Sequence, residues 1–316
     1  MTGSTTSLRT PLARWVMLLA PLLLAAAPVH AALELVATTE DLAALAREVG
    51  GDKVKVEALA KGYQDPHFVE PKPSFILKLH RADLLLVVGR ELEIGWLPPL
   101  VQQSRNREIQ PGGERYLDAS LTAEILEIPT GAITRAMGDV HPLGNPHYWL
   151  DPANGRRVAE AIRDKLSTIS PEDAEYFAGR YADFDRRLAE AEARWETQMA
   201  PWRGTRIVTY HNSWPNLCKR FGLEVVGYVE PRPGIPPSPR HTIELIGEIK
   251  RQGVHVIVVE PYFDLKTPGK IAEQTGAEVL VLMPSVGGEK DIKTYFDLFD
   301  HDVAALTASL GRAKGS

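Results

Sequence analysis

The chain has a single cysteine, Cys218, among its 316 residues. One thiol excludes an internal disulfide and a cysteine-rich zinc site. The formal net charge is only −5, so no basic surface predicts a nucleic-acid partner. The chain also lacks the His-Glu-x-x-His pattern, in which two histidines one helical turn apart bind zinc. Any metal site must therefore be assembled by the fold.

The N-terminal residues have the pattern of a secretory signal peptide. Arg9 and Arg14 precede an apolar run over residues 15–27, which is too short to span a bilayer. Val29-His30-Ala31 then offers a cleavage site, and no cysteine follows that could carry a lipid. We expect cleavage after Ala31 and export to the periplasm. The alternative is an uncleaved membrane anchor.

The chain is too long for one typical hydrophobic core and suits two α/β domains. Apolar segments alternate with amphipathic helices in both halves, the rhythm of parallel sheets covered by helices. The predicted strands cover residues 33–39, 54–59, 83–89, 206–210, 224–229, 254–260 and 279–283. The predicted helices between and after them cover residues 40–49, 74–81, 214–221, 241–252, 267–275 and 291–310. Residues 104–145 are expected to be irregular.

Two helices are predicted between these halves, over residues 152–169 and 171–199. The second would be about 40 Å long at 1.5 Å per residue, which suits a rigid spacer. We therefore expect a signal peptide at 1–31, an N-terminal βα domain at 32–152, linking helices at 153–202 and a C-terminal βα domain at 203–316.

Three histidines stand in turns beside aromatic residues: His67, His147 and His211. His67 follows a predicted strand of the first half, His211 follows one of the second half, and Glu260 ends another. Ligands of open α/β domains bind beyond the carboxyl ends of strands, so these side chains could face one interdomain cleft. Imidazoles with one carboxylate suit Zn²⁺, whereas Mn²⁺ prefers more oxygen ligands. Taken singly, each histidine could equally be structural or merely exposed.

Several motifs resemble the cluster A-I family of ABC-transporter substrate-binding proteins, the zinc- and manganese-binding periplasmic receptors. The resemblance covers the whole mature chain, and its most specific part is the run Pro146-His147-Tyr148-Trp149-Leu150-Asp151-Pro152. It also rests on Asp65-Pro66-His67, Tyr210-His211 and Val259-Glu260-Pro261. It implies that His67, His147 and His211 bind the metal, and a histidine at 211 resembles the zinc-preferring branch.

One departure concerns the fourth ligand. The family usually has an aspartate in Leu-Asp-Pro after the last strand, where this chain has Leu282-Met283-Pro284. A thioether is a poor zinc ligand, so we expect Met283 to pack in the core. Glu260 is the predicted fourth ligand. The alternatives are Asp264, Glu289 or water, with Glu260 instead orienting a histidine.

The histidine-rich loop of the family is nearly absent. Only His141 remains at that place, and we expect an exposed side chain without a ligand role, the alternative being a part in metal capture.

The function implied by the resemblance is a periplasmic receptor that captures Zn²⁺ as cargo and delivers it to an ABC permease. We expect a monomer without catalytic activity. One alternative is a zinc-dependent hydrolase, in which three protein ligands leave an open coordination position and a nearby acid acts as base. Another is a manganese or iron receptor of the same fold.

Overall fold

The apolar segments of the first half form a parallel four-stranded sheet. Its strands are β1 (Leu33–Ala37), β2 (Val54–Ala58), β3 (Leu84–Val87) and β4 (Tyr116–Asp118), in the order β2-β1-β3-β4. All four residues of β3 are buried, as expected for a continuous apolar strand covered on both faces. The computed structural model describes residues 1–4, 31–131, 141–232 and 234–314.

The second half repeats this topology. Strands β5 (Arg206–Thr209), β6 (Glu224–Tyr228), β7 (Val256–Val259) and β8 (Glu278–Val281) pair in parallel in the order β6-β5-β7-β8. The helices of the two halves are α1 (Glu40–Gly50), α2 (Pro73–Arg81), α3 (Leu97–Ser104), α4 (Pro152–Ile169), α5 (Ala174–Met199), α6 (Pro215–Phe221), α7 (Pro239–Gln252), α8 (Lys266–Thr275) and α9 (Tyr295–Lys314).

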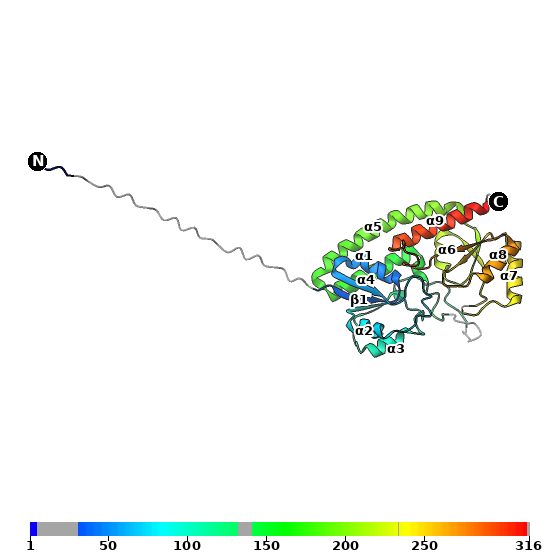
Figure 1. Cartoon of the computed structure of the whole chain (residues 1–316), viewed down its shortest axis with the longest axis horizontal. Helices are drawn as coiled ribbons and strands as arrows, with labels where there is room; N and C mark the ends of the chain where they lie inside the picture. Colours follow the sequence, from blue (N-terminus) through cyan, green and yellow to red (C-terminus); the bar gives the residue numbers. More distant parts are fainter. Residues whose placement is uncertain (5–30, 132–140, 233, 315–316) are drawn as a thin grey trace. The chain divides into compact units, whose positions relative to one another are not determined.

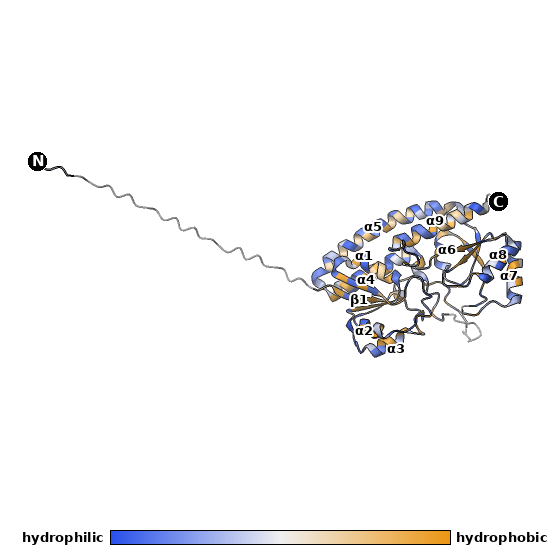
Figure 2. Cartoon of the chain, in the orientation of Figure 1, coloured by the Kyte–Doolittle hydropathy of each residue, from blue (hydrophilic) through white to orange (hydrophobic). Residues whose placement is uncertain are grey.

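Each sheet is covered by helices on both faces, because successive strand residues point to opposite sides. Leu35 and Ala37 of β1 belong to a hydrophobic cluster with α1, α4 and α5, while Val36 packs in a separate cluster with α2 and α3. In the second sheet Val258 joins the first of these clusters and Ile257 packs toward α7 and α8. One hydrophobic cluster therefore runs through both halves, and the strands in it are the most apolar segments in Figure 2.

The spacer helix α5 has 26 residues and runs beside α9 along one edge of residues 32–316 (Figure 1). Its buried face includes Phe177, Phe184 and Trp195. The Trp195 indole donates a hydrogen bond of 2.6 Å to Asp300 in α9, and Arg187 pairs with Glu48 in α1. The predicted α/β fold with a long helix linking two parallel sheets is confirmed.

The structure corrects the prediction for the region between β3 and α4. Helix α3 begins at two prolines and was not predicted, and β4 lies inside the segment expected to be irregular. β4 has only three residues, too few to show a period, and it forms by pairing Tyr116 with Leu85. The last helix also begins later than predicted, at Tyr295. Thr294 and Asp297 accept hydrogen bonds from each other's backbone N–H groups and cap it there.

The predicted signal peptide falls almost wholly in residues 5–30, outside the described part of the chain. Among the described residues, no helix is long and apolar enough to cross a membrane.

Candidate metal site

His67 is held in a turn that follows β2. The Asp65 carboxylate accepts a hydrogen bond of 2.9 Å from the His67 backbone N–H and contacts the ring Nδ1 at 2.7 Å. The buried Trp96 indole also holds this turn, because it donates a hydrogen bond of 2.9 Å to the Pro66 carbonyl. Because Asp65 occupies Nδ1, the Nε2 atom of His67 is left as the free donor atom.

His147 is positioned by a similar local motif. The Asn145 side-chain oxygen accepts a hydrogen bond of 2.9 Å from the His147 backbone N–H, as Asp65 does for His67. In both motifs a proline stands between the two residues and restricts the backbone to the turn. His147 is 1% exposed, and neither ring nitrogen has a hydrogen-bond partner among the described residues.

His211 lies just beyond the carboxyl end of β5. Its carbonyl accepts a hydrogen bond of 2.8 Å from Thr209, and its ring Nδ1 pairs with the carboxylate of Glu230. Glu230 follows β6, and the parallel pairing of β5 with β6 brings the two residues together. Both side chains are less than a tenth exposed. Glu230 thus leaves the Nε2 atom of His211 free, as Asp65 does for His67.

The three predicted histidines converge. One donor atom from each of His67, His147 and His211 lies within 4.8 Å of the other two. Their ring centroids are 5.2 to 5.6 Å apart. Nitrogen ligands of a tetrahedral zinc ion lie roughly 3.3 Å from one another, so small side-chain movements would bring all three onto one ion. Among the described residues this is the only group of three or more such side chains gathered in this way.

Glu260 directly follows β7 and is completely buried. Neither of its carboxylate oxygens has a hydrogen-bond partner among the described residues. Burial raises the pKa of this carboxyl to about 7, a shift opposed by the neighbouring charge of His211. The donor atoms that lie within 4.8 Å of one another do not include those of Glu260, so its role as fourth ligand stays a prediction.

The electrostatics keep His147 neutral. Burial, followed by the charges of His67 and His211, lowers its pKa well below the usual value. Burial also lowers the pKa of His211, but the Glu230 carboxylate more than offsets this, and the net shift is upward. A neutral imidazole is the form that binds metals. The His147 ring is therefore already in the form that could bind a metal, whereas a protonated His211 ring would first have to release a proton.

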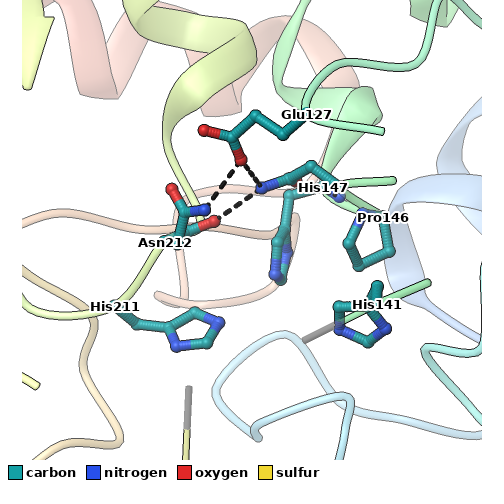
Figure 3. A pocket seen from close by; sticks show the side chains of 7 residues that line it. Glu127, His141, Pro146, His147, His211 and Asn212 are labelled. Atoms are coloured by element: carbon teal, nitrogen blue, oxygen red, sulfur yellow. Dashed lines mark hydrogen bonds between the residues drawn. The ribbon is translucent and has the colours of Figure 1, made fainter. Parts of the chain in front are cut away.

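A pocket of about 230 Å³ opens onto the cluster. Figure 3 shows His141, His147 and His211 around it, with Glu127 above them. The Glu127 carboxylate accepts hydrogen bonds from the Asn145 amide at 3.0 Å and from the Asn212 amide at 2.7 Å. These bonds tie the turn that carries His147 to the residue that follows His211, so the pocket wall is shared by both halves of the chain.

The other candidates for the fourth ligand lie outside the histidine cluster. Met283 is 4% exposed within the large hydrophobic cluster, so the prediction that it packs is confirmed. The Asp264 carboxylate is largely exposed, and Glu289 lies 3.9 Å from His301. Neither acid belongs to the clustered donor group.

The expectation that His141 is exposed is wrong, whereas the expectation that it has no ligand role stays a prediction. Its side chain is partly buried, and its Nε2 atom lies 3.1 Å from the Nε2 atom of His67. Sequence reasoning also missed Asp65 and Glu230 as partners of His67 and His211. The role of Asp65 could have been predicted, because Asp-Pro-His and Asn-Pro-His share the same spacing. The role of Glu230 could not, because it depends on the pairing of β5 with β6.

The family model of the periplasmic zinc-uptake complex component A, ZnuA, matches residues 35–309. The iron-binding protein YfeA of Yersinia pestis is 28% identical over 278 residues, which cover 85% of this chain and 83% of YfeA. The manganese ABC transporter substrate-binding lipoprotein PsaA of Streptococcus anginosus is 23% identical over 288 residues, with 89% of this chain and 90% of PsaA covered.

The chain also matches the zinc-binding lipoprotein AdcA of Streptococcus pneumoniae at 24% identity over 283 residues, which is 87% of this chain but 55% of AdcA. A crystal structure of ZnuA has a TM-score of 0.74 and 22% identity, covering 88% of this chain and 99% of that chain. This structural similarity shows the fold alone. The family match spans both sheets, α5 and the histidine cluster, and it confirms the resemblance drawn from the sequence. The chain therefore belongs to the family of periplasmic zinc-uptake component A proteins.

Proposed function

We propose that this chain is a periplasmic receptor that captures Zn²⁺ and delivers it to the membrane permease of an ABC importer. The observation that carries the proposal is the convergence of His67, His147 and His211, whose donor atoms lie within 4.8 Å of one another. Family membership supports the receptor role. The relatives named above bind iron, manganese or zinc, so the choice of zinc rests on this chain's own donors.

Zinc is favoured because the clustered donors are imidazole nitrogens. Zn²⁺ is held well by three imidazoles and one carboxylate in a tetrahedral arrangement. Mn²⁺ lies at the weak end of the affinity order for divalent ions and favours oxygen ligands. A manganese or iron receptor is the alternative, and competition between metals for the purified protein distinguishes them.

Glu260 is the proposed carboxylate ligand. Its buried oxygens have no hydrogen-bond partner among the described residues, and its charge acts directly on His211. A divalent cation beside it would compensate both the missing hydrogen bonds and the cost of burying the charge. Delivery to a permease requires no reacting group. The hydrolase alternative gains no support from the family.

The proposal places the mature chain in the periplasm after cleavage following Ala31. It treats residues 32–152 and 203–316 as two domains joined by residues 153–202, in a monomer. The mass of the protein recovered from periplasm tests the cleavage site, and light scattering tests the monomer.

Metal content and titration calorimetry test the central claim. We expect one Zn²⁺ per chain at sub-micromolar Kd, and a loss of binding of about 100-fold or more when any one of the three histidines is changed to alanine. His255→Ala is the matched control, because His255 is exposed and lies outside the cluster. Unchanged zinc affinity in all three cluster variants would place the site elsewhere. Sustained turnover of an ester, amide or phosphate substrate by the zinc-loaded protein would favour the hydrolase alternative.

A further inference from the structure

His141 approaches the histidine cluster from a segment that sequence reasoning treated as an exposed loop. Its Nε2 atom lies 3.1 Å from the Nε2 atom of His67. The two ring centroids are 5.2 Å apart, the same separation as between His67 and His147. His141 therefore lies as near to His67 as one of the three predicted ligands does.

The turn that carries His141 is anchored. The Gly144 N–H donates to the His141 carbonyl at 3.2 Å, and the Arg90 guanidinium donates to the Leu143 carbonyl at 3.3 Å. Gly144 has a φ of +96°, and a Cβ atom there would collide with Ile125 at 2.4 Å. The backbone of residues 141–144 is thus fixed by neighbours of its own, and the imidazole is held beside the cluster.

The pairing of the two Nε2 atoms is compatible with a shared proton or a shared cation. Asp65 accepts from Nδ1 of His67, so in the neutral ring Nε2 carries a lone pair that faces His141. Two such nitrogens can share a proton, or both can bind one cation. Nitrogen ligands of a tetrahedral zinc ion are roughly 3.3 Å apart, close to the observed separation.

We propose that His141 is a fourth imidazole ligand of the same metal ion that His67, His147 and His211 bind. The inference rests on the proposed function and extends its ligand set. His141 lines the open pocket, whereas Glu260 is completely buried and does not line it. Because zinc can expand from four to five ligands, binding by His141 is compatible with a further carboxylate ligand.

A further imidazole has a consequence for metal choice. Nitrogen donors strengthen Zn²⁺ binding more than Mn²⁺ binding, because the stability of complexes rises from manganese toward copper and zinc. His141 should therefore contribute to the discrimination between the two metals as well as to affinity.

The test compares His141→Ala, His141→Gln and the control His255→Ala, all as full mature chains. Zinc and manganese affinities are measured by calorimetry, and the visible spectrum of the Co²⁺-loaded protein reports its ligand set. We expect both His141 variants to raise the zinc Kd by about 100-fold, to raise the manganese Kd less, and to change the cobalt spectrum. Thermal unfolding of the metal-free variants checks that they fold.

Two results would overturn the inference. Zinc affinity within twofold of the parent in both His141 variants would do so, as would a weakened affinity with an unchanged cobalt spectrum, which marks a packing role. In either case the parent protein would still bind one zinc ion, so the proposed function would stand without His141 as a ligand. The proposed function itself would fail if the parent protein did not bind zinc. If the variants do not fold, the count of imidazole ligands from X-ray absorption of the zinc-loaded parent decides: four supports the inference and three overturns it.

Discussion

The two sheets have the same strand order, and in each half a buried glutamate follows the third strand. The two glutamates differ in their hydrogen bonding. After β3, the Glu93 carboxylate accepts hydrogen bonds from Thr38 at 2.6 Å, from the Val88 N–H at 2.7 Å and from the Gly89 N–H at 3.1 Å. After β7, the Glu260 carboxylate has no hydrogen bond of ordinary geometry among the described residues, and only the Ser213 hydroxyl and the charge of His211 oppose the effect of burial on its pKa from outside its own backbone. Burial raises the pKa of both groups to about 7.

The difference supports a structural role for Glu93 and the proposed ligand role for Glu260. A buried carboxylate with three donors is partly compensated, because each hydrogen bond offsets some of the cost of burial. A buried carboxylate without donors destabilises the fold by itself, so it needs another partner. The charge of His211 acts on Glu260, and the other histidines lie around His211. The C-terminal sheet thus has a poorly compensated acid that interacts with a histidine of the cluster, and the N-terminal sheet does not.

The largest expected effect is on metal affinity in Glu260→Gln. We expect the zinc Kd to rise by about 100-fold, because a charged oxygen donor is replaced by a neutral amide. The thermal midpoint of the metal-free protein should not fall, since the substitution removes an unpaired buried charge. Titration calorimetry and metal-free thermal unfolding measure the two quantities. Zinc affinity equal to that of the parent would remove Glu260 from the ligand set.

Glu93→Gln should give the opposite pattern. The amide nitrogen would face backbone N–H donors, so the free energy of unfolding should fall by about 1–3 kcal/mol. Zinc affinity should stay that of the parent, because the Glu93 carboxylate is bound by Thr38, Val88 and Gly89 of its own half. Chemical denaturation of the metal-free protein checks the first expectation and calorimetry the second. If Glu93→Gln weakened zinc binding as much as Glu260→Gln does, the two glutamates would not have different roles.

The pH dependence of stability gives a smaller effect. Both pKa values lie above the ordinary 4.5, so below pH 7 the folded protein holds protons that the unfolded chain has released. Metal-free stability should therefore fall as pH rises from 6 to 8, by about 1 kcal/mol for each group. Asp41 and Asp302, which are also buried with pKa values raised to about 7, add to the same trend. Denaturation at several pH values should show a shallower slope in either glutamine variant, and an unchanged slope in both would contradict the assignment.

The smallest effect is expected at Met283, which follows β8. Met283→Leu keeps the volume and the apolar character of a residue that is 4% exposed. We expect the free energy of unfolding to change by less than about 1.5 kcal/mol and zinc affinity to stay the same. A clear fall in zinc affinity with normal stability would instead make the thioether a ligand.

Most of the architecture could be predicted because apolar periodicity is a local property. The strands of both halves and the long helix α5 each carry their own pattern, so they were found. Helix α3 and strand β4 were missed for different reasons. The first has Pro98 and Pro99 in its first turn and is only eight residues long, and the second owes its extended form to pairing with β3.

The histidines were found from their turns and from the family resemblance, but their partners were not. Asp65 lies two residues from His67, and its role was overlooked in an otherwise recognised motif. Glu230 lies nineteen residues from His211, and only the neighbouring positions of β5 and β6 bring the carboxylate to the ring. His141 is 74 residues from His67, so no local pattern could have predicted their contact.

The sequence by itself therefore determined the two βα halves, the spacer helix and the three histidines in turns, because each depends on neighbouring residues. Only the tertiary structure decided which acids support these histidines, how differently the two buried glutamates are hydrogen-bonded and that His141 lies beside His67. The reason is physical: hydrogen bonding and burial of a side chain are set by whatever the fold places around it, and those neighbours come from distant parts of the chain.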